Sequence, residues 1–101
     1  MARIRKKNRI DANQPEIVDA LREIGAMVIS MTGDPTIGFD ILVGFRGKLF
    51  AMEIKDGSKP PSKRQLTDDE KIRRLEFEAV DCDYFIPLSV DDALRAIGAI
   101  T

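Results

Sequence analysis

Asp40, Glu53 and Lys55 are the three residues of this chain whose types and spacing could perform chemistry together. They belong to two apolar-rich runs that meet at Arg46 and Gly47, and a glycine between two such runs predicts a β-hairpin. With those two residues as the loop, Asp40 lies directly opposite Glu53, and their Cβ atoms are roughly 5 Å apart. Lys55 follows Glu53 by two positions, which places it on the same face of the strand. Two acids and a lysine are therefore expected to converge.

The other face of this hairpin is expected to be apolar and to supply part of a core. Its members are Ile41, Val43, Phe45, Phe50, Met52 and Ile54. An Asp and a Glu-x-Lys segment often form only a surface ion pair. Because the polar residues of this hairpin collect on one face, we favour a functional cluster over such a pair.

Two carboxylates that face each other repel, so neither ionises fully unless a positive charge compensates them. A divalent cation provides that compensation, and a small set of oxygen ligands suits Mg²⁺ or Mn²⁺ better than Zn²⁺. A lysine beside such a site can hold a scissile phosphate or the attacking water. The cluster therefore predicts metal-assisted hydrolysis of a phosphate ester.

Asp40 followed by Glu53-Ile54-Lys55 resembles the motif of the PD-(D/E)XK nucleases. Over residues 12–98 the chain is similar to the small bacterial and phage VRR-NUC-like members of that superfamily. The segments that carry the resemblance are 13–22, 40–44, 53–57, 60–62 and 66–67. Phe39 stands where the family usually has proline, and Glu70 stands where many relatives carry glutamine.

The resemblance implies an α/β fold with a small mixed central sheet flanked by helices, in the order αβββαβα, and a restriction-endonuclease-like core. It implies a DNA endonuclease in which Asp40, Glu53 and the backbone carbonyl of Ile54 bind Mg²⁺ or Mn²⁺. Lys55 would stabilise the negative charge that develops on the phosphate. The alternative is a non-catalytic nucleic-acid-binding module on the same fold, and the intact Asp, Glu and Lys set counts against it.

Three further residues are candidates to complete the site. Relatives use an acid on the first helix as a metal ligand, and Glu16 is its match, although it also fits an ordinary first-turn acid. Gln65 and Glu70 are rivals for the other side of the site, and Glu70 also fits a helix capping box begun by Thr67.

The resemblance also implies branched DNA, such as a four-way junction, as the substrate, and a homodimer as the enzyme. The expected location is the cytoplasm of a bacterial or phage-infected cell. An apolar strip of Ala93, Ile97 and Ile100 could form the dimer contact, or it could pack on the sheet of its own chain.

Basic residues are concentrated in two places, and both are candidate DNA contacts. An N-terminal arm, residues 1–11, precedes a single nuclease domain, residues 12–101. Its basic residues are Arg3, Arg5, Lys6, Lys7 and Arg9. The loop after the motif strand carries Lys59, Lys63 and Arg64. Each group could bind phosphates or be only a solvated surface, and the nuclease motif favours phosphate binding.

Composition excludes several other kinds of site. The chain has 101 residues and no histidine, so His-based acid–base catalysis and histidine metal sites are excluded. The single cysteine, Cys82, excludes an internal disulfide and a cysteine-rich zinc site. No apolar stretch approaches the ~20 residues of a membrane span.

Local signals predict the remaining elements. Asn13 is expected to cap a helix with Pro15 in its first turn, and Gly25 to end it. A strand follows over residues 26–31. A second helix begins after Thr67, with Ile72, Leu75 and either Phe77 or Ala79 facing inward. Residues 84–88 form a strand, and a helix over 89–96 ends near Gly98. Asp34 and Asp56 are expected to be loop acids, each tied to an adjacent turn.

Overall fold

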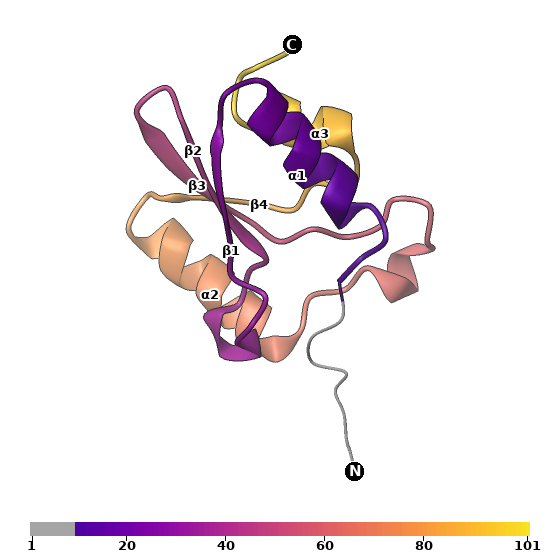
Figure 1. Ribbon diagram of the computed structural model, residues 1–101. Coiled ribbons are helices and arrows are strands. Elements are labelled where there is room, and N and C mark those ends of the chain that lie inside the picture. The colour runs from indigo at the N-terminus through magenta and orange to yellow at the C-terminus, as the bar shows by residue number, and fades with distance from the viewer. Residues whose placement is uncertain (1–9) are drawn as a thin grey trace.

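The computed structural model describes residues 10–101, and it shows a mixed α/β fold with a four-stranded sheet and three α-helices (Figure 1). Two single-turn 3-10 helices, Pro35–Ile37 and Pro61–Lys63, lie in the loops before β2 and after β3. The main elements along the chain are α1 (Gln14–Glu23), β1 (Met27–Ser30), β2 (Ile41–Phe45), β3 (Lys48–Met52), α2 (Asp68–Ala79), β4 (Asp83–Phe85) and α3 (Val90–Ala96).

The sheet has the strand order β1-β2-β3-β4, in which the first three strands are antiparallel and β4 runs parallel to β3. The predicted two-residue hairpin loop is confirmed, because Phe45 pairs with Lys48. Arg46 and Gly47 both have positive φ angles, 51° and 82°. Positive φ at both loop residues characterises the type I′ turn, whose twist matches that of the strands it joins. Because the turn makes Phe45 pair with Lys48, it also fixes which residues of β2 and β3 pair along the rest of the hairpin.

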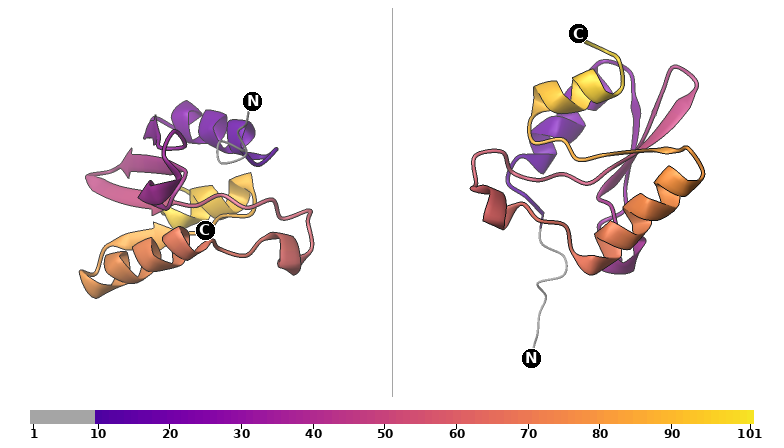
Figure 2. Two further views of the ribbon diagram at one scale, coloured as in Figure 1. Left: turned by 90° about the horizontal axis from the view of Figure 1, so that it is seen from below. Right: turned by 180° about the vertical axis from the view of Figure 1, so that it is seen from behind.

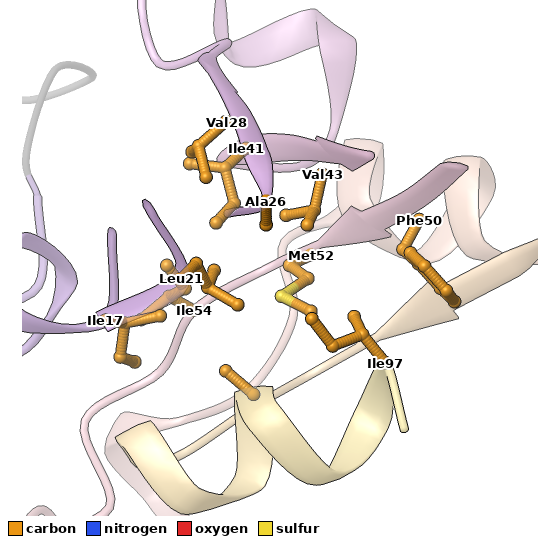
Figure 3. Close-up of a cluster of buried hydrophobic side chains, with 11 residues drawn as sticks. Ile17, Leu21, Ala26, Val28, Ile41, Val43, Phe50, Met52, Ile54 and Ile97 are labelled. Atoms are coloured by element: carbon orange, nitrogen blue, oxygen red, sulfur yellow. The ribbon is translucent and has the colours of Figure 1, made fainter. Parts of the chain in front are cut away.

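The hydrophobic core lies between one face of the sheet and the helices α1 and α3 (Figure 3). The predicted apolar face of the hairpin is confirmed. Phe45 is partly buried and packs against the core. The fully or almost fully buried members of that face are Ile41, Val43, Phe50, Met52 and Ile54. Figure 2 shows α1 and α2 on opposite sides of the sheet.

The apolar strip near the C-terminus belongs mainly to this core. Ala93 and Ile97 are only 1% and 7% exposed, and both belong to the core cluster, whereas Ile100 is 38% exposed. The prediction that this strip could form a dimer contact is therefore wrong for Ala93 and Ile97, because α3 needs them to cover its own sheet. None of the helices within residues 10–101 is long and apolar enough to cross a membrane.

Helix α2 covers the other face of the sheet and faces it differently from the prediction. Ile72 and Leu75 are 56% and 65% exposed, so their predicted inward orientation is wrong. The helix instead directs Phe77 toward Tyr84, with ring centroids 5.7 Å apart, and Glu70 toward the end of β3. Residues spaced by seven share one side of a helix, so the opposite stripe is left to solvent.

Two helix starts were predicted from their capping residues, and one of these predictions is wrong. The capping box of Thr67 and Glu70 is present in both directions, as predicted. Asn13 precedes α1, but its backbone is helical and its side chain makes no capping hydrogen bond. Its amide is instead directed to two distant backbone carbonyls, those of Lys55 and Leu88.

Candidate functional site

Backbone hydrogen bonds hold the hairpin together at the point where Asp40 meets the end of β3. The Asp40 N–H donates to the Met52 carbonyl at 2.9 Å. Two residues past the strand, the Ile54 N–H donates to Oδ2 of Asp40 at 2.8 Å. The carboxylate of Asp40 thus takes the place of a strand carbonyl, and it is fixed beside the chain that carries Glu53 and Lys55.

Glu53 and Lys55, in the chain just after β3, form backbone hydrogen bonds on the side away from Asp40. The Glu53 N–H donates to the Phe85 carbonyl at 2.9 Å, and the Lys55 N–H donates to the Pro87 carbonyl at 3.2 Å. The extension of β3 is therefore held between Asp40 on one side and the chain after β4 on the other. This arrangement directs the Glu53 and Lys55 side chains into one cleft, as the period of two predicts.

Lys55 lies between two carboxylates. Its Nζ is 3.2 Å from Oε2 of Glu53 and 3.2 Å from Oε1 of Glu70. The side chains are 13%, 4% and 15% exposed for Lys55, Glu53 and Glu70, so this cluster is mostly shielded from water. Oε1 of Glu70 also accepts the Thr67 N–H at 2.9 Å. The capping box therefore also positions Glu70 for its ion pair with Lys55.

The cluster lines a cleft of about 680 Å³ that opens between the loop before β2, the end of β3 and the start of α2. Its side chains are mixed in charge, with acids around the motif and two lysines from the loop after it. The charged lining residues are Asp11, Asp34, Asp40, Glu53, Lys55, Lys59, Lys63, Asp69 and Glu70. Acids outnumber lysines in this lining, so a ligand that carries phosphates would need an accompanying cation to bind there.

Burial and neighbouring charge strongly perturb the ionisation of these groups. Burial, followed by the negative charges of Asp40 and Glu70, raises the pKa of Glu53 to about 9. Burial also raises the pKa of Asp40, against the opposing effect of its hydrogen bond from the Ile54 N–H. For Lys55, burial lowers the pKa, but the charges of Glu53 and Glu70 outweigh it and leave the pKa raised. The site thus disfavours two ionised acids and favours a protonated lysine.

These properties determine whether a divalent cation fits. Among residues 10–101, no three His, Cys, Asp or Glu side chains form a group that could hold a metal ion by themselves. The donor set that the resemblance implies is the carboxylates of Asp40 and Glu53, which line the cleft, with the backbone carbonyl of Ile54. All of these donors are oxygens, which suits Mg²⁺ or Mn²⁺. Burial, to which neighbouring negative charges add, raises the pKa of both acids, so a bound cation would favour their ionised forms.

Two of the other predicted site residues, Glu16 and Gln65, lie outside the cleft lining. Glu16 is exposed in the first turn of α1 and is not part of the cleft lining. Gln65 is also exposed and outside the lining, so of the two rivals Glu70 reaches the cleft.

The predicted DNA contacts divide in the same way. Lys59 and Lys63 line the cleft, while Arg64 is half-buried beside it with an Nε that has no hydrogen-bond partner. The five basic residues of the N-terminal arm, Arg3, Arg5, Lys6, Lys7 and Arg9, lie outside the described residues.

Sequence reasoning missed several residues that shape the cleft. Asp11 and Asp69 line it, and a charge plot of the chain could have marked both as acids next to a helix start. Tyr84 donates its hydroxyl to the Gly38 carbonyl at 2.6 Å, which supports the chain just before Asp40. No local pattern signals that bond, since it depends on β4 lying beside β3.

Asp34 was predicted to be tied to its adjacent turn, and this is confirmed. Its Oδ1 accepts from the backbone N–H and the hydroxyl of Thr36, at 2.9 and 2.7 Å. Asp34 lines the same cleft as Asp40 but is engaged in its own turn, which makes it a useful reference for the motif acids.

Comparison of the chain with protein-family models, with curated proteins and with solved structures finds no match.

Proposed function

We propose that the protein is a metal-dependent DNA endonuclease of the PD-(D/E)XK superfamily, built on a restriction-endonuclease-like core. The observation that carries this proposal is the meeting of Asp40, Glu53 and Lys55 in one shielded cleft at the end of the hairpin. The spacing of Asp40 and Glu53-Ile54-Lys55 along the sequence also supports it, because it resembles the PD-(D/E)XK motif. A structural ion pair does not require a second buried acid at the same point.

In this proposal each residue of the cluster has a separate task. Asp40 and Glu53, with the Ile54 carbonyl, would hold Mg²⁺ or Mn²⁺. When bound, such a cation acts as a Lewis acid and lowers the pKa of a water molecule. Lys55 stays protonated between its two acids and donates to the phosphate as negative charge develops there. Glu70 keeps the Lys55 ammonium in place and balances its charge.

The substrate is proposed to be DNA, with branched DNA such as a four-way junction preferred. Lys59 and Lys63 would bind phosphates at the edge of the cleft, and the basic N-terminal arm would add sequence-independent contacts. Paired cuts across a junction need two active sites, so a symmetric homodimer is part of the proposal. We place this activity in the cytoplasm of a bacterial or phage-infected cell.

One observation favours the alternative, a non-catalytic nucleic-acid-binding module. Lys55 already neutralises part of the acid cluster through its bonds to Glu53 and Glu70. A domain that had lost its metal could be stabilised in this way and still bind DNA through its lysines. The two proposals differ in a single respect that is easily measured, because only the nuclease breaks phosphodiester bonds when Mg²⁺ is added.

The test is a cleavage assay with duplex, flap and four-way-junction DNA, in Mg²⁺, Mn²⁺ or EDTA. We expect cleavage by the wild type with either metal, none in EDTA, and none by Glu53→Gln. The matched control is Asp34→Asn, which removes one charge from the same cleft without touching the motif, and it should still cleave. DNA binding without cleavage under all conditions would establish the alternative.

A further inference from the structure

The side-chain amide of Asn13 connects three segments of the chain at the end of the proposed catalytic strand. Its Nδ2 donates to the Lys55 carbonyl at 3.1 Å and to the Leu88 carbonyl at 3.2 Å. These acceptors lie 42 and 75 positions away along the chain. Asn13 therefore joins the start of α1 both to the extension of β3 and to the segment between β4 and α3.

The identity of this side chain follows from what it faces. Two carbonyl oxygens are acceptors only, so the group between them must supply two N–H donors. Asparagine does so with one amide group, whereas aspartate of the same size would add a third acceptor. Oδ1 of Asn13 is buried without a hydrogen-bond partner, and the side chain does not cap its helix. The bonds to the two carbonyls are thus the interactions that this amide makes.

The strand needs such a donor because its neighbour cannot provide one. Past Met52, the chain of β3 continues beside the segment after β4, and its N–H groups donate to that segment. In a regular parallel ladder the neighbour would donate in return. In the register of these bonds, Pro87 lies where the donor to the Glu53 carbonyl would be and has no N–H, and the donor to the Lys55 carbonyl would be the Ser89 N–H. Ser89 is the N-cap residue of α3, and the Lys55 carbonyl accepts from Asn13 instead.

The Leu88 carbonyl is a second fixed point for the same segment. It accepts from Asn13 and also from the Gly57 N–H at 3.2 Å. The backbone approaches closely there, since a Cβ on Gly57 would lie 2.9 Å from the Leu88 oxygen. Lys55 is therefore held at its own N–H by Pro87, at its carbonyl by Asn13, and two residues later by Leu88.

We propose that Asn13 is a positioning residue, whose amide fixes the Lys55 backbone so that the ammonium stays between Glu53 and Glu70. The role of this position in catalysis rests on the proposed nuclease function. Asn13 itself acts only through the backbone and touches no reacting atom. A group that must meet a phosphate within a fraction of an ångström depends on such support.

The test uses Asn13→Asp, which keeps the size and removes the donors, together with Asn13→Ala, which adds no charge. Single-turnover and steady-state cleavage should show kcat lowered about 10-fold in both variants, with KM changed less than about 2-fold. The control is Ile97→Val, which weakens the core between α3 and the sheet without altering a polar group. It should leave kcat unchanged even where its melting temperature falls as far as that of the Asn13 variants.

A second readout does not depend on activity. Lys55 is mostly shielded, so its reaction with an amine-acylating reagent, followed by mass spectrometry, should be slow in the wild type. It should become severalfold faster in both Asn13 variants, while the exposed Lys59 reacts at an unchanged rate. If the wild type cleaves no DNA, the nuclease proposal fails, and the labelling still decides whether Asn13 holds Lys55. Unchanged Lys55 labelling in both variants would overturn the positioning role, as would faster labelling with an unaltered kcat.

Discussion

Replacing the buried Glu53 with glutamine is expected to stabilise the metal-free protein at pH 8, although the same change removes a proposed metal ligand. The Glu53 side chain is 4% exposed and lies beside the charges of Asp40 and Glu70. Its pKa is raised from 4.5 to about 9, so the folded protein retains a proton that the unfolded chain releases. An acid whose pKa is raised on folding contributes stability that is present at low pH, and this stability is lost as the pH rises from about 4.5 toward 9.

The size of the effect follows from the pH window. Each pH unit corresponds to about 1.4 kcal/mol, so between pH 4.5 and pH 8 the raised pKa of Glu53 lowers the free energy of unfolding by at most about 5 kcal/mol. Glutamine also loses the attraction to Lys55, but Lys55 keeps its second partner, Glu70. We therefore expect Glu53→Gln to raise the free energy of unfolding at pH 8 by about 1–3 kcal/mol, and by less than about 1 kcal/mol at pH 5.

The assay is urea unfolding in EDTA at pH 5, 6.5 and 8, followed by circular dichroism. The quantity of interest is the stability difference between Glu53→Gln and the wild type, which should grow as the pH rises. Glu78→Gln changes an exposed acid of α2 and should stay within about 0.5 kcal/mol of the wild type throughout. A Glu53→Gln protein that is less stable than the wild type at pH 8 would refute the reasoning, because the carboxylate would then be a net stabilising group.

Four further outcomes follow from the same structure. Asp40→Ala should abolish cleavage while the protein stays folded, which circular dichroism and a cleavage assay check together; a folded variant with wild-type turnover would remove Asp40 from the site. Lys55→Ala should lower kcat by about 10²-fold with a much smaller change in metal affinity, and lost DNA binding at unchanged turnover would make it a phosphate-binding residue instead. Deleting residues 1–9 should weaken DNA binding and flatten its dependence on salt, and an identical salt slope would show that the arm only aids solubility. Sedimentation at micromolar concentration should show a dimer, and a monomer with and without junction DNA would contradict it.

The hairpin and the placement of its polar and apolar residues could be predicted because they depend on short-range rules. Gly47 with apolar residues on both sides located the turn, and the period of two then placed Asp40, Glu53 and Lys55 in relation to one another. The buried face followed from the same count, since Met52 belongs to the alternate set. Each of these inferences needs only the pairing of two adjacent strands.

Features that depend on distant packing could not be predicted in this way. Asparagine is a residue type that often caps helices, but the amide of Asn13 instead donates to two carbonyls from distant parts of the chain. Ile72 and Leu75 look like an inward stripe, yet α2 meets the sheet through Glu70 and Phe77. In both cases a tertiary contact overrides a sound local preference.

The surroundings of two loop acids, Asp34 and Asp56, could also be predicted from neighbouring residues alone. Asp56 accepts from the Ser58 N–H and hydroxyl at 2.9 and 2.7 Å, as an acid two residues before a serine in a turn should. The same rule applies to Asp34 and Thr36. These acids are locally engaged, so the sequence alone separates them from Asp40 and Glu53.

The measurement that tests the proposed metal centre most directly is a calorimetric titration of Mn²⁺ into the DNA-free protein at pH 8, in two buffers with different ionisation enthalpies. If Asp40 and Glu53 hold the cation, the wild type should bind Mn²⁺ and release close to one proton, because Glu53 must ionise when the metal enters. Glu53→Gln should bind at least about 10-fold more weakly and release no proton, while Asp34→Asn should behave as the wild type. Equal Mn²⁺ affinity in the wild type and Glu53→Gln, or no binding to the wild type at all, would contradict the assignment of this cleft as a metal site.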